Sequence, residues 1–145
     1  MIRPLNAGDR AAWEPLFLAY GVFYETEFTP EIIDKVWSLL MESGSGIDGL
    51  VADNDGTLVG FAHYRSHPDT FTGGRDWFLD DLYVDPDARG AGTATDLIQH
   101  LTTLARESGP AGSLRWITAA DNSRAQRVYD RIATKTTWVT YEKSL

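Results

Sequence analysis

Apolar side chains recur three and four residues apart in three stretches of the chain, the spacing that places them on one face of an α-helix. The clearest stretch is 94–105, whose apolar stripe consists of Ala94, Leu97, Ile98, Leu101, Leu104 and Ala105. The first stretch follows Asp9 and contains Trp13, Leu16, Phe17 and Tyr20. The second begins at Thr29-Pro30, a capping hydroxyl before a first-turn proline, and runs to Leu40. A short fourth helix is predicted after Asn122-Ser123, which can cap it.

Short apolar runs between turn residues predict the strands. Two of them, 49–52 and 58–62, flank a four-residue turn at 53–56 whose Asp, Asn and Gly residues tolerate the positive φ of a tight hairpin loop. Further strands are predicted at 2–5, 77–84, 114–118 and 138–141, and an irregular loop at 67–76. No repeat or long linker interrupts this order, so the pattern predicts one α/β domain over residues 1–145.

The composition excludes several kinds of chemistry. The chain has no cysteine, which removes disulfides, thiolate nucleophiles and thiolate metal sites. Its 13 basic residues are scattered and its net charge is −8, so we expect no nucleic-acid partner. The same acidity favours the approach of a cationic acceptor, although acidic surfaces also serve solubility alone. No stretch has the roughly 20 apolar residues of a membrane span, and the start lacks the apolar core of a signal peptide, so we expect a cytoplasmic protein without a membrane partner.

A glycine-rich turn joins the predicted strand at 77–84 to the helix at 94–105. At such a junction the unpaired backbone amides of the helix N-terminus point at one place, where anions bind. Gly90 and Gly92 let the backbone approach a phosphate, and Arg89 adds positive charge. The turn lacks the lysine and hydroxyl of a nucleotide P-loop, and Thr95 stands where a dinucleotide fingerprint has glycine. It therefore predicts a phosphate site of another kind, or an ordinary glycine-assisted turn.

Two stretches carry motifs in a fixed order: 82–94, with Arg89, Gly92 and Ala94, and 121–130, with an asparagine, an alanine and a tyrosine. Together they resemble the motifs of the GNAT superfamily of N-acetyltransferases. The stretch 82–94 resembles its acetyl-CoA motif, Q/R-x-x-G-x-G/A, which is matched by Arg89, Gly92 and Ala94. The stretch 121–130 is similar to the second motif, in which an asparagine, an alanine and a tyrosine recur at these spacings. The segments 2–5 and 129–133 resemble the histone and polyamine acetyltransferase branch. The resemblance implies a central mixed, mostly antiparallel twisted sheet flanked by about four helices.

The resemblance also implies acetyl-CoA as co-substrate and assigns residues to it. The backbone of Leu82, Tyr83 and Val84 would hold the pantetheine arm like an added strand. The pyrophosphate would lie on the amides of Arg89, Gly90, Ala91, Gly92, Thr93 and Ala94. Asn122 and Tyr129 would flank the thioester. The sequence departs from the family after Tyr129, where a usual glycine and aromatic pair is replaced by Arg131-Ile132-Ala133, and the next aromatic is Trp138.

Acetyl transfer to an amine needs a base, because alkyl amines with a pKa near 10.4 arrive protonated. Asp80 and Asp81 are the candidates, and as strand neighbours they should point to opposite faces. The resemblance favours Asp80, which stands where related polyamine enzymes carry a catalytic glutamate. Either acid could instead be a strand-end carboxylate that pairs with an arginine. Tyr129 is the expected general acid for the departing thiolate, or else a core tyrosine, and a strand amide near Leu82 would hold the oxyanion.

The acceptor is expected to be a primary amine on a polyamine, an amino acid, another small molecule or a protein lysine, attacking acetyl-CoA directly in a ternary complex. Tyr24 and Glu25, between the first two helices, could form an aromatic and acidic cradle for it together with Asp80, or simply pack. A non-catalytic acyl-CoA-binding regulatory module is the alternative. His63 and His67 do not lie on a helix, so we expect no metal. A homodimer would shelter the edge of the predicted last strand.

Overall fold

The central sheet is built from the apolar runs of the sequence. The computed structural model describes all of residues 1–145, and its five strands lie in the order β1-β2-β3-β4-β5. Their bounds are β1 Ile2–Pro4, β2 Asp48–Asn54, β3 Thr57–Pro68, β4 Arg75–Val84 and β5 Ala111–Arg115. All neighbours are antiparallel except β4 and β5, which are parallel. The sheet is thus mixed and mostly antiparallel, as the resemblance implied.

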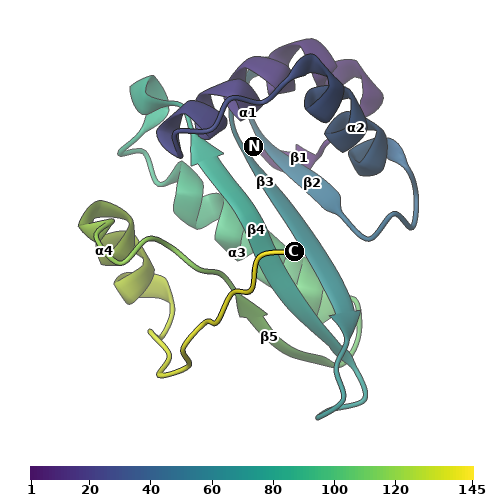
Figure 1. The fold of residues 1–145 in the computed structure, drawn as a ribbon, viewed down its shortest axis with the longest axis vertical. Helices are drawn as coiled ribbons and strands as arrows, with labels where there is room; N and C mark the ends of the chain where they lie inside the picture. The colour runs from purple at the N-terminus through teal and green to yellow at the C-terminus, as the bar shows by residue number, and fades with distance from the viewer.

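The helices cover both faces of this sheet (Figure 1). Their bounds are α1 Arg10–Phe23, α2 Pro30–Met41, α3 Thr93–Glu107 and α4 Ser123–Ile132. One core cluster joins α1 and α2 to one face through Trp13, Phe17 and Phe61. The other joins α3 to the opposite face through Leu97, Leu101 and residues of β2, β3 and β4. None of the four helices is both long enough and apolar enough to cross a lipid bilayer.

The parallel strands β4 and β5 separate part of the way along their length. Their paired residues run from Arg75 opposite Ala111 to Phe78 opposite Arg115, and β4 continues to Val84 without β5 beside it. Asp76 fastens the paired half, because its Oδ1 accepts hydrogen bonds from the backbone N–H of Ser113 at 2.8 Å and from its hydroxyl at 3.0 Å, and its Oδ2 pairs with Arg115. The outer edge of β4 is therefore open from residue 79 onward.

Three predicted boundaries differ from the structure. The irregular loop expected at 67–76 is shorter, because β3 extends to Pro68 and β4 starts at Arg75. The strand expected at 114–118 is β5, which ends at Arg115, where the two parallel strands diverge. The last strand expected at 138–141 is absent: residues 133–145 form no regular element and are all exposed. An extended segment needs a neighbouring strand for its backbone hydrogen bonds, and this one has none within the chain.

Candidate active site

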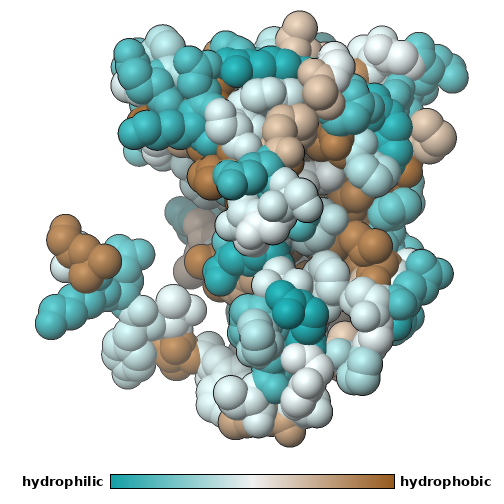
Figure 2. Space-filling view, turned by 90° about the vertical axis from the view of Figure 1, so that its right-hand side faces the viewer, coloured by the Kyte–Doolittle hydropathy of each residue, from teal (hydrophilic) through white to brown (hydrophobic).

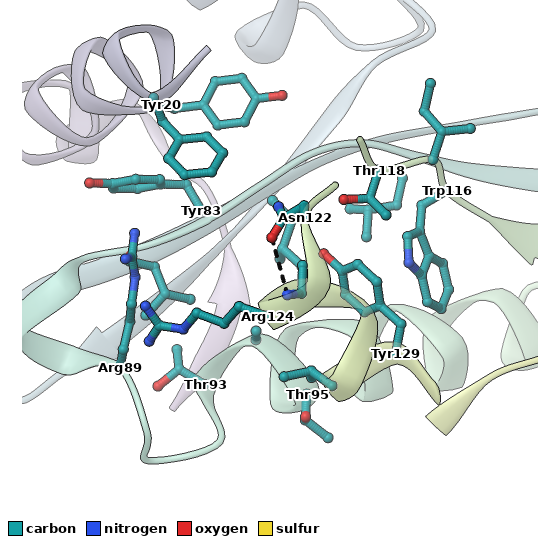
Figure 3. A pocket seen from close by; sticks show the side chains of 18 of the residues that line it. Tyr20, Tyr83, Arg89, Thr93, Thr95, Trp116, Thr118, Asn122, Arg124 and Tyr129 are labelled. Carbon is teal, nitrogen blue, oxygen red and sulfur yellow. Dashed lines mark hydrogen bonds between the residues drawn. The ribbon is translucent and has the colours of Figure 1, made fainter. Parts of the chain in front are cut away.

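A cavity of about 370 Å³ lies where β4 and β5 separate. The open edge of β4, the N-terminus of α3, the segment after β5, α4 and the end of α1 form its walls (Figure 3). Its lining includes Tyr20, Tyr24, Asp80, Leu82, Tyr83, Val84, Arg89, Gly90, Gly92, Thr93, Ala94, Trp116, Asn122, Arg124 and Tyr129. The two motifs start at residues 82 and 121, which are 39 positions apart in the sequence. In the structure they face each other across one cavity.

The turn before α3 presents its backbone amides to this cavity. Gly90 and Gly92 have φ values of 89° and 84°, in the left-handed region that favours glycine, and a Cβ at either position would meet no atom within 4 Å. Gly92 is the N-cap of α3 and, having no side chain, leaves the first-turn amides without a side-chain acceptor. The helix dipole adds a partial positive charge at the same place. The arrangement is that of a candidate anion site open to solvent.

Two arginines flank this anion site. Nε of Arg89 donates to the carbonyl oxygen of Val84 at 3.1 Å, and the Arg89 guanidinium lies 5.9 Å from the centre of the Tyr83 ring. Arg124, on α4, extends across the cavity toward Arg89 and Thr93 (Figure 3). Free amides, two guanidinium groups and an open strand edge match the needs of a diphosphate joined to an amide-containing arm. The donor set thus fits acetyl-CoA.

Tyr129 and Asn122 come from α4 on the far side of the cavity. The Tyr129 ring lies 5.4 Å from that of Trp116, in an edge-to-face arrangement. Burial, and secondarily the nearby Tyr24, raises the pKa of the Tyr129 phenol, so it carries its proton at neutral pH. Oδ1 of Asn122 accepts a hydrogen bond from the backbone N–H of Ala125 at 3.2 Å and so caps α4. This cap fixes the first turn of the helix that carries Tyr129.

A β-bulge in β4 determines on which face of the sheet the side chains of Asp80 and Asp81 lie. The pairing with β3 shifts by one residue between His63 and Tyr64, which leaves Asp80 without a partner position. Asp80 accepts from Nε of Arg65 at 3.0 Å, and Asp81 lies 2.9 Å from Nδ1 of His63. Because His63 and Arg65 are two residues apart on one strand, both carboxylates lie on the α1 side. The prediction of opposite faces is wrong, since the bulge interrupts the alternation.

The two carboxylates differ in their surroundings. Asp80 lines the cavity and is paired with the exposed Arg65. Asp81 lies behind Tyr20, whose hydroxyl donates to its Oδ1 at 2.8 Å. Burial acts to raise the pKa of Asp81, but the hydrogen bonds from His63 and Tyr20 outweigh it, so this pKa lies below its usual value. Burial and the charge of Asp81 raise the pKa of Tyr20 well above its usual range.

Most of the residues expected from the sequence meet in the cavity, and three do not. Ala91, Asp81 and Glu25 lie outside its lining. Glu25 is in the exposed turn after α1, with a φ of 54°, next to Tyr24, which does line the cavity. The role of Glu25 in binding an acceptor therefore stays a prediction. The structure holds no group of three or more side chains arranged as metal ligands.

The cavity also contains residues that the sequence did not single out. In the sequence Tyr20 belongs to the apolar face of the first predicted helix. Its hydroxyl group, at the end of that face, is the one feature that could have predicted a polar partner. Arg124 lies inside the second motif, between the asparagine and the alanine. Trp116 belongs to the segment that follows β5, where the strands separate. Its place depends on that separation, which no local pattern encodes.

Comparisons with known proteins agree with this geometry. The model of the "Acetyltransferase (GNAT) family" matches residues 10–133. A D-amino-acid N-acetyltransferase of Saccharomyces cerevisiae is 29% identical, over 99% of this chain and 90% of the relative. A crystal structure of a ribosomal-protein-alanine N-acetyltransferase from Brucella melitensis biovar Abortus 2308 is 28% identical, with a TM-score of 0.83 over 100% of this chain and 99% of that chain.

An aminoglycoside N-acetyltransferase in complex with CoA is 20% identical, with a TM-score of 0.83 over 99% of this chain and 93% of that chain, which supports the fold alone. The family match covers most of the sequence, and the cavity presents the donor set that acetyl-CoA requires. The chain belongs to the GNAT family of acetyltransferases and is an acetyl-CoA-dependent N-acetyltransferase that acts on amines.

Proposed function

We propose that this enzyme acetylates the primary amine of a small molecule, with amine and acetyl-CoA held together in the cavity. One observation carries the proposal: the cavity has two chemically different ends. The amides of the Gly90–Thr93 turn and two arginines form a cationic end. Tyr20, Tyr24 and Asp80 form an aromatic and acidic end, which complements an ammonium group. An anionic acyl donor and a cationic acceptor thus have separate places.

Direct attack by the amine is favoured over an acyl-enzyme pathway. A covalent route needs an activated nucleophile, most often a cysteine, a lysine or a serine paired with a base. The chain has no cysteine, and the cavity lining contains no lysine, histidine or serine. Bound acetyl-CoA supplies the acetyl group and a thiolate leaving group. The residues of the chain then have to orient the amine, accept its proton and protonate the thiolate.

Three groups fit these tasks. Asp80 faces the cavity as a carboxylate and is the candidate to take the proton of the amine, directly or through water. Tyr129 is a protonated phenol on the opposite wall and is the candidate to protonate the thiolate. The backbone amide of Leu82, on the open edge of β4, is the candidate to stabilise negative charge on the acetyl oxygen.

Amino acids are the first acceptors to test, because a relative similar over nearly the whole chain is named a D-amino-acid N-acetyltransferase. Polyamines are the second group, given the resemblance of segments 2–5 and 129–133 to the histone and polyamine branch. The experiment offers acetyl-CoA with D- and L-amino acids, polyamines, aminoglycosides and lysine peptides, and identifies products by mass spectrometry. Saturable acetylation of one small-amine class is the expected result. Acetylation of peptides alone, or binding of acetyl-CoA without any product, would contradict the proposal.

We also propose that the enzyme is a homodimer that uses its C-terminal segment, residues 133–145. Trp138 and Tyr141 are 83% and 94% exposed, although their neighbours have the composition of a strand. Figure 1 shows the segment crossing in front of the sheet, and Figure 2 shows a segment standing away from the body of the molecule. β5 is an outer strand with an unpaired edge. A segment with exposed aromatic side chains and a free sheet edge are complementary when supplied by two copies.

A further inference from the structure

A buried histidine connects the interior of the protein with the acceptor end of the cavity. His63, on β3, is 1% exposed. Its ring is surrounded by Trp13 and Phe17 from α1, Phe61 from the same strand and Asp81 from β4. Of these neighbours only Asp81 carries a charge. A polar ring at this depth requires hydrogen bonds on both nitrogens, and His63 has them.

These hydrogen bonds determine which nitrogen carries the proton. Nε1 of Trp13 can only donate, and it lies 3.0 Å from Nε2 of His63, so Nε2 accepts and has no proton. The ring is therefore neutral, and its one proton lies on Nδ1, which donates to Oδ2 of Asp81 over 2.9 Å. A second proton on Nε2 would set two donors against each other around the fully buried Trp13.

The same series of bonds ends at the cavity wall. Tyr20 donates its hydroxyl proton to Oδ1 of Asp81 over 2.8 Å, so each carboxylate oxygen accepts one fixed hydrogen bond. Because this proton is committed to Asp81 and Tyr20 lines the cavity, an amine that reaches the Tyr20 oxygen meets only its lone pairs. The N–H of an ammonium group is the natural donor to such an oxygen, and the carboxylate behind it adds attraction.

We propose that His63 is a positioning residue for amine recognition. Trp13 holds the ring neutral, and the ring holds Asp81 in the orientation that keeps the Tyr20 oxygen an acceptor for the ammonium group of the substrate. This inference rests on the proposed function, because it assigns the amine end of the same cavity. It gives the enzyme an ammonium site in which one tautomer of a buried histidine orients the carboxylate.

The protonation state of His63 is measurable without any substrate. The chain has three histidines, and long-range ¹⁵N–¹H correlation spectra of histidine-labelled protein distinguish the two tautomers from the charged ring. A His63→Asn variant identifies the His63 signals by their loss. We expect a neutral ring whose proton lies on Nδ1. A His63 ring that is protonated on Nε2, or on both nitrogens, overturns the proposal.

The effect on the substrate is tested with two replacements of His63. His63→Leu removes the donor to Asp81, whereas His63→Asn keeps an N–H near the position of Nδ1. We expect KM for the amine to rise about 10- to 100-fold in the leucine variant, the range for loss of a hydrogen bond to a charged group, and only a few-fold in the asparagine variant. The Kd of acetyl-CoA should stay the same in both.

His67→Leu is the matched control, because His67 is an exposed histidine on the same strand whose ring hydrogen-bonds to the carbonyl of Pro68. It should leave both constants unchanged. An unchanged KM in His63→Leu, or equal damage to amine and acetyl-CoA binding, overturns the positioning role. If the wild-type enzyme acetylates no amine, the proposed function fails, and the tautomer measurement still decides the arrangement around His63.

Discussion

The hydroxyl of Tyr20 donates a hydrogen bond to Oδ1 of Asp81 over 2.8 Å, although the two residues are 61 positions apart in the sequence. This bond joins the last turns of α1 to the middle of β4. It places one aromatic wall of the cavity, since the Tyr20 and Tyr24 rings are 4.9 Å apart and both line it. An N-terminal helix therefore forms the proposed acceptor end of the site, and the two sequence motifs form the proposed acetyl-CoA end.

Replacing Gly92 by leucine should weaken acetyl-CoA binding at least ten-fold. A side chain here would occupy open space at the edge of the cavity that the first-turn amides of α3 need for an anion, because Gly92 lines the cavity and no protein atom lies within 4 Å of its Cβ position. The left-handed φ of 84° adds a folding cost of about 1–2 kcal/mol. Calorimetric titration with acetyl-CoA gives the Kd.

Gly44→Leu is the control for that experiment. Gly44 has a φ of 81° and equally open surroundings, but it lies in the loop after α2 and does not line the cavity. The two variants should lose similar stability, and only Gly92→Leu should lose affinity. An unchanged Kd for Gly92→Leu would show that the turn before α3 does not bind acetyl-CoA.

Tyr129→Phe should lower kcat about 100-fold or more, the contribution typical of a general acid, and change the Kd of acetyl-CoA by less than about two-fold. The ring would still pack against Trp116, so only the proton is lost. Since burial raises the pKa of this phenol, turnover should not fall through its ionisation between about pH 7 and 9. Steady-state kinetics give the comparison, with the Kd of acetyl-CoA as the internal control. Equal turnover would refute the general-acid role.

The free energy of unfolding should decrease in acid, because the Asp76 carboxylate, which joins β4 to β5, becomes protonated. Burial acts to raise the pKa of Asp76, but its bonds to Ser113 and Arg115 prevail and lower it. When the folded-state pKa lies below the unfolded value near 3.9, the carboxylate stabilises the folded protein at every pH above the unfolded value. This stabilisation is lost as the pH falls through the folded-state pKa. Urea unfolding should therefore show a plateau above about pH 5 and a decline below about pH 4.

Asp76→Asn should reduce stability at pH 7 by about 2 kcal/mol and flatten the acid decline. It removes the negative charge that fastens β4 to β5 just before the strands diverge. Glu107→Gln, at the exposed end of α3, serves as the control. A variant with wild-type stability at pH 7 and the full acid decline would mean that the Asp76 bonds contribute little.

Deleting residues 134–145 should convert a dimer into a monomer, as measured by sedimentation velocity. The deletion removes the exposed Trp138 and Tyr141 and no part of the sheet. Trp138→Asp is the smaller change and should weaken the dimer in the same direction, because a charge is costly in an apolar contact. A wild-type chain that sediments as a monomer at every concentration would contradict the dimer proposal.

Local patterns were sufficient for the four helices, for most of the strands and for the glycine-rich turn before α3, but not for the last predicted strand or for the facing of Asp80 and Asp81. The apolar stripe of residues 94–105 and the cap at Thr29 predict α3 and α2, because both signals act within a few residues. The bulge at Asp80 arises from the register between two strands, so alternation along β4 alone gives the wrong facing for Asp81.

Other errors have the same origin in long-range contacts. In the sequence His63 is an isolated histidine in a predicted strand. Its two hydrogen-bond partners, Trp13 of α1 and Asp81 of β4, are far from it in the sequence and meet it only in the fold. Residues 138–141 have strand composition but no strand beside them, which is a property of the rest of the chain and not of the segment.

Direct transfer in a ternary complex is tested by initial rates of CoA thiol release, measured while the concentrations of acetyl-CoA and one amine are both varied. If both substrates are held at once between β4 and α4, double-reciprocal plots should intersect, and acetyl-CoA should bind in calorimetry without the amine. Parallel lines would require an acyl-enzyme, for which the cavity offers no activated nucleophile. Tight acetyl-CoA binding without thiol release for any amine would contradict catalysis and identify an acyl-CoA-binding module instead.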